Sequence, residues 1–373
     1  ALLPSRTQQA VMQEPVKRAL PVQVLCRFRG QSPCEADCGG EDAWNLSGAR
    51  VALKHEFAGA GTFPDMCFHH VHGPEATQVD VYDALQPVVD AVLQEQTNGC
   101  ILCYGQTSAG KTYTMEGKAG AERGIIPRTL ETVFNALGPD ETVTISMLEI
   151  YMERLRDLLG ETDAELAIVE DSNKEIYVRG LREVTVTSCQ DALSVFAEGQ
   201  NHRAVAATGM NERSSRSHSI FILKIGSQKL LLVDLAGSEC MKKTLPNAGL
   251  QSTPSKSTCT LNNSDIMEEA KAINQSLLAL GLVIKQLAEQ RPGAYIPYRN
   301  SKLTRVLSDC LGTCSSRTAL VVNCSMSCLQ ISESISTLRF GARAQSCVNI
   351  APVGNKESAL VRTLRCAKVE IMR

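Results

Sequence analysis

The octapeptide GQTSAGKT, residues 105–112, has the composition and spacing of a phosphate-binding loop. It fits the pattern G-x-x-x-x-G-K-[ST] at every fixed position, with Gly105, Gly110, Lys111 and Thr112. Glycines let backbone N–H groups curl around a triphosphate, the lysine neutralises its β- and γ-phosphates, and the threonine hydroxyl ligates Mg²⁺. The apolar run CILCY before the loop predicts a buried strand that leads into a helix N-terminus. These features favour a nucleoside triphosphate site over a chance match in a Gly-rich turn.

A second motif, KLLLVDLAG at residues 229–237, supplies the other half of such a site. An apolar strand is followed by Asp234 and, three residues later, by Gly237. The aspartate can hold Mg²⁺ through water, and the glycine N–H can meet the γ-phosphate, so the loop would respond to hydrolysis. A guanine-specific enzyme would offer N-K-x-D, whereas the nearest strings, NKEI at Asn173 and NKES at Asn355, lack the aspartate. The two motifs together predict an ATPase.

Between them lies NERSSRSH, residues 211–218, which is densely polar. Such a segment is either a solvated loop or a switch that folds its hydroxyls over a nucleotide. The residues alone leave both interpretations open.

Strand-like and helix-like segments alternate along the chain, which predicts an α/β fold with a central, mostly parallel or mixed β-sheet and helices on both faces. Strands are expected at residues 22–28, 142–149, 220–225, 229–234 and 318–325, the third and fourth forming a hairpin across Gly226 and Ser227. Helices are expected at residues 74–94, 190–205, 268–290 and 301–311.

Composition excludes several classes of protein. With 373 residues, 43% hydrophobic and 21% charged, the chain can bury a large core. A net charge of -2 gives no sign of nucleic-acid binding. No stretch approaches the ~20 apolar residues of a membrane span, and the N-terminal residues lack the apolar region of a signal peptide. We therefore expect a cytosolic protein without membrane insertion.

The cysteines and histidines give little sign of a metal site. Fifteen cysteines is an odd number, and most lie in apolar runs, which predicts reduced core residues. Cys100 and Cys103 form a C-x-x-C without a second pair at zinc-site spacing. The cluster of His69, His70 and His72 is expected to be a solvated loop.

The motifs GQTSAGKT, NERSSRSH and DLAGSE, in this order, resemble the kinesin motor domain. The likeness continues through YGQTSAGKTYTMEG, GIIPR, LEIYMERLRDLL, AINQSLLALG, YIPYRNSKLTRVLSDCLG and STLRFGARA, and spans residues 22–348. It is strongest to N-terminal motors of the conventional type. The resemblance implies a P-loop NTPase fold of kinesin type and a microtubule-stimulated ATPase that uses ATP and Mg²⁺ to move along microtubules in the cytoplasm. It also implies a dimer formed through a coiled coil outside this chain. The expected divisions are an extension at residues 1–20, the motor at 21–346 and the neck linker with the start of the neck at 347–373.

The resemblance assigns the phosphate and metal contacts to three segments. Those in the phosphate loop are Gly105, Gln106, Thr107, Ser108, Ala109, Gly110, Lys111 and Thr112. Ser214 and Ser215 match the switch I serines that close over Mg²⁺ and the γ-phosphate, and Asp234 matches the aspartate that holds a Mg²⁺-bound water. Magnesium is therefore expected at Thr112, Ser215 and, through water, Asp234.

Hydrolysis is expected to depend on charge and positioning, without a side-chain base. Arg216 matches the arginine that pairs with Glu239 of switch II when the site is closed. Such a pair can align the attacking water and exclude bulk solvent. The predicted catalytic residues are Arg216, Glu239, Ser215, Gly237 and Lys111.

The base of the nucleotide is expected to lie against three side chains. Tyr113 matches the position whose ring packs on adenine, and Arg27 and Arg29 match the R-x-R at the end of the first strand. The family usually has proline next, where this chain has Gly30. This departure predicts looser contacts with adenine.

Acidic tubulin is expected to meet a basic face of the motor. The candidate residues are Arg154, Arg156, Lys271, Arg299, Lys302 and Arg305. Without the resemblance, scattered surface charges would be an equal interpretation. Two departures predict altered mechanical coupling: Leu282 stands where many relatives have asparagine, and Cys347 where a docking isoleucine is frequent.

Residues 246–264 are an insertion relative to the family, with few large apolar side chains. Burial cannot offset the ~1 to 2 kcal/mol per residue needed to order such a backbone, which predicts a mobile loop. Lys242, Lys243 and Lys256 would attract acidic tubulin, while a tolerated insertion without a role carries equal weight.

The sequence argues against two other functions. One is a nucleotide-insensitive microtubule-binding module, and the intact set Lys111, Thr112, Ser215, Arg216, Asp234, Gly237 and Glu239 speaks against it. The other is a tubulin-depolymerising ATPase, which is disfavoured because no long basic insertion surrounds residues 140–142.

Overall fold

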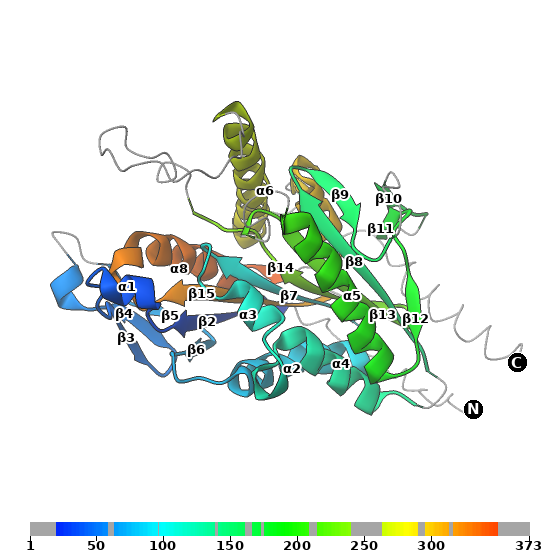
Figure 1. Ribbon diagram of the computed structural model, residues 1–373, viewed down its shortest axis with the longest axis horizontal. Coiled ribbons are helices and arrows are strands. Elements are labelled where there is room, and N and C mark those ends of the chain that lie inside the picture. The colour runs from blue at the N-terminus through cyan, green and yellow to red at the C-terminus, as the bar shows by residue number, and fades with distance from the viewer. Residues whose placement is uncertain are drawn as a thin grey trace, which may run out of the picture.

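A mixed β-sheet forms the centre of the molecule (Figure 1). The computed structural model describes residues 20–58, 63–95, 97–138, 141–160, 166–172, 175–208, 215–239, 263–289, 295–312 and 316–349. The strand order is β12-β8-β13-β14-β7-β15-β2-β6, and β9 pairs with β8. The strands are β2 Gln23–Arg29, β6 His70–His72, β7 Asn98–Gly105, β8 Val143–Tyr151, β9 Arg154–Asp157, β12 Val184–Val186, β13 His218–Ile225, β14 Gln228–Asp234 and β15 Ser316–Ser325.

The sheet is parallel in one half and antiparallel in the other. The pairs β14–β7, β7–β15, β15–β2 and β2–β6 are parallel, whereas the pairs β12–β8, β8–β13 and β13–β14 are antiparallel. The predicted α/β class is confirmed in its mixed form, and the predicted hairpin is β13–β14. In the parallel half, β7 ends at Gly105 and the adjacent β14 ends at Asp234. The two phosphate motifs therefore lie at the same edge of the sheet.

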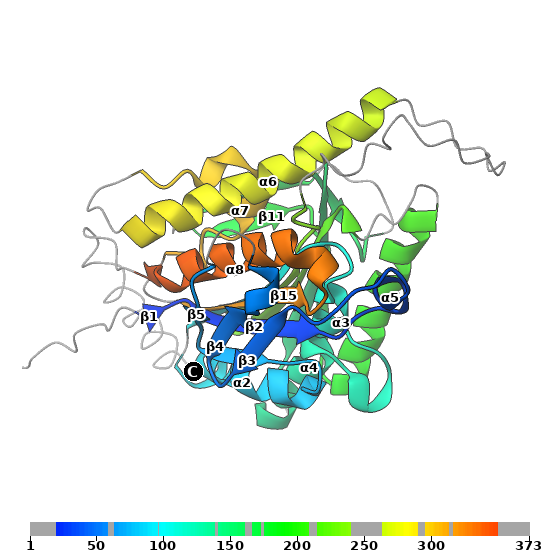
Figure 2. The ribbon, with the colours of Figure 1, turned by 90° about the vertical axis from the view of Figure 1, so that its left-hand side faces the viewer.

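Helices cover both faces of this sheet (Figure 2). One face carries α6 Asn263–Glu289, α7 Lys302–Val306 and α8 Ile331–Gln345, and the other carries α2 Gln78–Gln94, α4 Ile125–Ala136 and α5 Cys189–Thr208. Alternating residues of β2 supply the two cores, because Val24 and Cys26 pack with α6 and α8 while Leu25 packs with α2. Because successive side chains of a strand point to opposite faces of the sheet, the order of its residues determines which of them pack against which helices.

Shorter elements surround the sheet. They are α1 Pro33–Asp37, α3 Lys111–Met115, the three-stranded sheet of β3 Trp44–Ser47, β4 Arg50–Leu53 and β5 Met66–Cys67, the pair β10 Ala167–Glu170 and β11 Ile176–Arg179, and the pair β1 Leu20–Pro21 and β16 Val348–Asn349. The last pair joins segments from opposite ends of the described chain. Among the helices that the structure describes, none has the length and apolar character needed to cross a membrane.

Three expectations about local structure were wrong. The helix expected at residues 301–311 is only α7, because its C-cap is at Leu307 and the chain then turns to bury Cys310 and Leu311. The helix α2 begins at Gln78, four residues later than expected, because Thr77 caps it through a reciprocal contact with Asp80. His70 and His72 lie on the edge strand β6 and not in a loop.

The cysteines of the described residues are thiols without a disulfide. Cys100 and Cys103 belong to the two opposite cores of the sheet, so they cannot share a metal ion. The expectation of core cysteines is wrong for Cys34, Cys38 and Cys67, which are exposed. Residues 246–262 of the insertion, with Lys242 and Lys243 before it, lie outside the described residues.

Candidate functional site

The phosphate loop is a tight connection from β7 into α3. Gly105 has φ of 152°, and a Cβ there would collide with the carbonyl oxygen of Asn323 in β15. Gly110, the N-cap of α3, has φ of 97°. Both conformations favour glycine, and they leave the loop free to present backbone N–H groups. The motif glycines are therefore explained by backbone geometry.

Lys111 lies inside the loop that it terminates. Its Nζ donates to the carbonyl oxygens of Gly105 at 2.9 Å and Gln106 at 2.8 Å, and the residue is 6% exposed. Burial lowers the pKa of this amine, and the negative charges of Asp234 and Glu239 partly oppose this shift. A buried cation in a cradle of backbone is suited to a polyanionic ligand.

The oxygen atoms next to Lys111 suit a magnesium ion. The Thr112 hydroxyl donates to Oδ2 of Asp234 at 2.7 Å, which brings the two predicted ligand positions together. Oδ1 of Asp234 is buried and has no hydrogen-bond partner among the described residues. A hydroxyl and a carboxylate with a free oxygen are hard ligands of the kind that Mg²⁺ and its bound waters prefer. The donor set therefore fits the ion.

A buried charge network that sequence reasoning missed supports Asp234. Arg203 of α5 lies 3.1 Å from Asp234 and 3.2 Å from Glu116, and Gln200 donates to Glu116 at 2.7 Å. Burial opposes the charge on Arg203, but the two carboxylates outweigh it and raise its pKa. Arg203 thus offsets negative charge that would otherwise stand uncompensated beside the metal position.

The segment after β14 bonds directly to the phosphate loop. The Ser238 N–H donates to Gly105 O at 3.1 Å, and the Gly237 N–H donates to Ser215 O at 2.8 Å. The Glu239 carboxylate accepts from the N–H of Thr107 at 2.8 Å and also from its hydroxyl. The predicted residues of the phosphate loop, switch I and switch II therefore meet.

The roles of the predicted site residues remain predictions. Ser214 lies outside the described residues. The contacts described above place Glu239 against Thr107, so its pairing with Arg216 is not established by them.

Arg27 and Tyr113, two of the three expected base-binding residues, lie against each other, with Tyr113 in α3. The Arg27 guanidinium lies 5.1 Å from the centre of the Tyr113 ring, and Lys118 lies 5.8 Å from it. Arg27 is 8% exposed and donates to Gln78 at 2.6 Å and Thr114 at 2.9 Å. Burial lowers the pKa of Arg27. Arg27 therefore braces Tyr113 from the core side.

Arg29 is clamped next to the phosphate loop. It forms a two-pronged ion pair with Glu35, at 2.6 Å and 2.9 Å, and its Nε donates to Ser108 O at 2.6 Å. The hydrogen bond from Arg29 lowers the pKa of Glu35 to about 2. At the neighbouring departure from the family pattern, a Cβ on Gly30 would meet Pro74 at an ordinary 3.7 Å.

Comparisons with known proteins agree with this geometry. A family model described as the kinesin motor domain matches residues 27–347. The chain belongs to the kinesin motor domain family. It is 41% identical to a kinesin heavy chain of Neurospora crassa over 94% of this chain and 38% of that protein. It is 40% identical to kinesin-related protein 3 of Dictyostelium discoideum, covering 94% of this chain and 29% of that one.

The fold also matches a solved kinesin. A structure described as that of a fast kinesin superposes with a TM-score of 0.76 at 40% identity, covering 91% of this chain and 95% of that one. This confirms the expected P-loop NTPase fold of kinesin type. The chain spans less than two fifths of the length of the two relatives named above.

The candidate track contacts of this kinesin domain come from neighbouring elements. The Lys302 N–H donates to Glu153 in the β8–β9 turn at 2.7 Å, which brings α7 next to Arg154. Arg299, just before α7, lies 3.7 Å from Glu170 of β10. Lys271 is exposed on α6, which packs on α7. The remaining two candidates are Arg156, 3.7 Å from Glu149, and Arg305 in α7.

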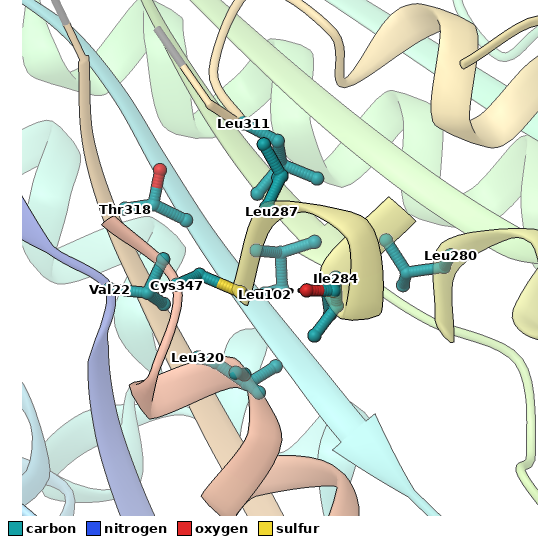
Figure 3. A pocket seen from close by; sticks show the side chains of 10 residues that line it. Val22, Leu102, Leu280, Ile284, Leu287, Leu311, Thr318, Leu320 and Cys347 are labelled. Carbon is teal, nitrogen blue, oxygen red and sulfur yellow. Dashed lines mark hydrogen bonds between the residues drawn. The ribbon is translucent and has the colours of Figure 1, made fainter. Parts of the chain in front are cut away.

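The segment after α8 lies against α6. Cys347 is 2% exposed, its Sγ is 3.1 Å from the carbonyl oxygen of Ile284, and Figure 3 shows it in an apolar pocket with Val22. Burial raises the pKa of this thiol to about 12. Leu282, the other departure from the family, is 39% exposed on α6. Cys347 therefore occupies a buried position, whereas Leu282 faces outward.

Proposed function

We propose that this chain is the motor domain of an ATP-driven microtubule motor. The observation that carries the proposal is the hydrogen-bonded junction of the three nucleotide segments: Thr112 with Asp234, Glu239 with Thr107, and Gly237 with Ser215. A ligand at the phosphate loop would thus contact both switch segments, and these segments could move when the nucleotide is hydrolysed. Family membership supports the same activity.

Lys111, Thr112 and Asp234 would hold Mg²⁺·ATP. Lys111 would exchange its two carbonyl contacts for the phosphates, and Thr112 and Asp234, together with Ser215, would hold the ion. When bound, Mg²⁺ neutralises charge on the phosphates. Glu239 would leave Thr107 to pair with Arg216 and exclude bulk water, while Gly237 would exchange Ser215 O for the γ-phosphate.

The base would lie against the Tyr113 face that Arg27 does not cover. Arg27 fixes the ring, and Arg29 fixes the backbone of Ser108 at the outer side of the phosphate loop. Aromatic stacking accepts any base, so the neighbouring contacts would set the preference for adenine.

The partner would be the acidic surface of a cytoplasmic microtubule. Four elements, β9, α6, α7 and the segment before it, carry the six basic candidates, and α6 and α7 are in contact. Opposite charge would steer the encounter and set the register on the track. Movement of α6 would then free or bind the segment after α8, which we assign to a neck linker beginning at Cys347. In the full-length protein, two such domains would be joined by a coiled coil.

ATP turnover with and without microtubules tests this proposal. We expect microtubules to raise turnover at least about tenfold, and a non-hydrolysable ATP analogue to strengthen microtubule binding relative to ADP. Thr112→Val, which keeps the shape and removes the hydroxyl, is the matched control and should lose turnover. If microtubule affinity is the same with either nucleotide and no ATP is turned over, the chain would instead be a nucleotide-insensitive microtubule-binding module.

A further inference from the structure

His218 is a buried residue to which the proposed nucleotide chemistry gives no role. It closes the NERSSRSH segment, begins β13 and is 2% exposed. Both ring nitrogens have partners: the Ala236 N–H lies 3.0 Å from Nδ1, and Ser276 Oγ lies 2.8 Å from Nε2. The imidazole therefore bridges the segment after β14 and the helix α6.

The contacts determine the direction of each hydrogen bond. Because a backbone N–H can only donate, Nδ1 of His218 accepts from Ala236 and the ring proton lies on Nε2. Nε2–H then donates to Ser276 Oγ, and the Ser276 hydroxyl donates to Ile273 O at 2.8 Å. Burial lowers the pKa of His218 to about 3, and the positive charges of Arg203 and Lys111 add to this effect. The ring is therefore neutral at pH 7.

One end of this bridge lies in the segment next to the phosphate loop, and the other lies on α6, which carries a candidate track contact. Ala236 precedes Gly237, whose N–H meets Ser215, and Ser238, whose N–H meets the phosphate loop. Ser276 lies on the inner face of α6, five residues after the exposed Lys271. A shift of the Ala236 amide must therefore either carry α6 with it or leave a buried imidazole nitrogen without a partner.

We infer that His218 is a positioning residue that couples the Leu235–Glu239 segment to α6 through Ser276. The inference rests on the proposed function, because it specifies how a change at the nucleotide reaches the track-facing helix. A buried donor without an acceptor is unfavourable, so the bridge has two favourable arrangements, intact or fully rearranged, and few between them. A purely apolar contact has no such directional requirement, so it would let α6 move by small steps without a large loss of free energy.

Ser276→Ala tests the bridge. It removes the acceptor of Nε2–H while keeping a good helix former. Its matched control is Ser334→Ala in α8, also 2% exposed, whose hydroxyl donates to Ser325 O and which does not contact the bridge. We expect Ser276→Ala to lower the ratio of microtubule-stimulated to basal turnover at least about tenfold, and Ser334→Ala to change it less than about twofold. Equal ratios in the two variants would overturn the inference.

Two further measurements separate the bridge from the proposed function and from simple misfolding. Ser276→Thr keeps the hydroxyl and should restore most of the ratio, whereas failure of this rescue would indicate a packing role. Imidazole ¹⁵N resonances of the wild-type protein should report a neutral ring protonated at Nε2, and a proton on Nδ1 would contradict the bridge whatever the activity. A wild-type protein that microtubules do not stimulate would defeat the proposed function itself, and the coupling with it.

Discussion

The candidate nucleotide site and the proposed track-facing surface of this kinesin domain are built in opposite ways. At the nucleotide site, Lys111 and Asp234 are almost fully buried, and each makes several hydrogen bonds or ion pairs. On the track-facing surface, Arg299 is exposed, and its ion pair with Glu170 is 3.7 Å long. Single substitutions should therefore have large effects at the first and small, salt-dependent effects at the second.

The largest effect should come from Lys111→Ala. It removes the main countercharge in the phosphate loop, so nucleotide affinity or turnover should fall at least about 100-fold. Fluorescent-nucleotide titration and steady-state turnover measure the two quantities. Lys118→Ala is the control, because Lys118 also lies near Tyr113 but its side chain is 72% exposed. Normal turnover of Lys111→Ala would refute the assignment of the site.

Arg216→Ala and Glu239→Ala should each abolish microtubule-stimulated hydrolysis and leave ADP affinity near the wild-type value, because the pair is proposed to form in the closed, triphosphate-bound state. The double variant should be little worse than either single one, as expected for groups that act as a unit. Thr107→Ala, which removes only the hydroxyl contact with Glu239, should affect turnover less. Additive losses in the double variant would argue against a pair.

Arg203→Ala should act mainly on stability. It leaves the carboxylates of Asp234 and Glu116 buried together, and breaking a buried ion pair costs about 3–5 kcal/mol. Urea unfolding measures the change. Arg317→Ala is the control, since Arg317 and Glu95 form a pair much more open to solvent, with side chains 32% and 51% exposed, for which a loss under about 1 kcal/mol is expected. If both variants lost the same free energy of unfolding, burial would not explain the difference between the Arg203 and Arg317 ion pairs.

The same contrast decides what could be predicted from the sequence. The phosphate loop is local, so its spacing identified Gly105 and Lys111, and β14 with Asp234 followed from a single apolar run. Arg203 could not be found in this way, because its partners Glu116 and Asp234 lie 87 and 31 positions away. A charged residue in a helical pattern does not reveal whether the fold buries it.

The fold shows the same limit. The β13–β14 hairpin was predicted because Gly226 and Ser227 separate two apolar runs, and Gly226 adopts a φ of 57° in that turn. The antiparallel pairing of β8 with β13 was not, because α5 intervenes in the chain and alternation of strands and helices favours a parallel crossover. Long-range strand order depends on packing that local patterns do not contain.

Lys302→Ala and Arg305→Ala should each weaken microtubule affinity a few-fold at low salt, because partly exposed charges contribute modestly to an encounter. The two losses should add, and both should shrink as the salt concentration rises. Arg50→Ala, in the sheet of β3, β4 and β5, is the control for loss of one exposed positive charge. Cosedimentation at several salt concentrations gives the affinities. Losses that are independent of salt would contradict an electrostatic track surface.

The smallest effect should come from Gly30→Ala, at the edge of the base site. A Cβ at Gly30 has room, since it would meet Pro74 at 3.7 Å, and its φ lies outside the left-handed region. The change should raise the free energy of unfolding by about 0.4–1 kcal/mol by restricting the unfolded chain, and tighten nucleotide binding less than about threefold. Gly39→Ala is the matched control, because Gly39 has φ of 76° and alanine there is strained. If Gly39→Ala stabilised the protein and Gly30→Ala destabilised it, the claim that Gly30 and not Gly39 accommodates a Cβ would be wrong.

Turnover links the base site to the comparison with the phosphate loop. If Gly30→Ala changed turnover as much as Lys111→Ala, the base site would be as tightly constrained as the phosphate site.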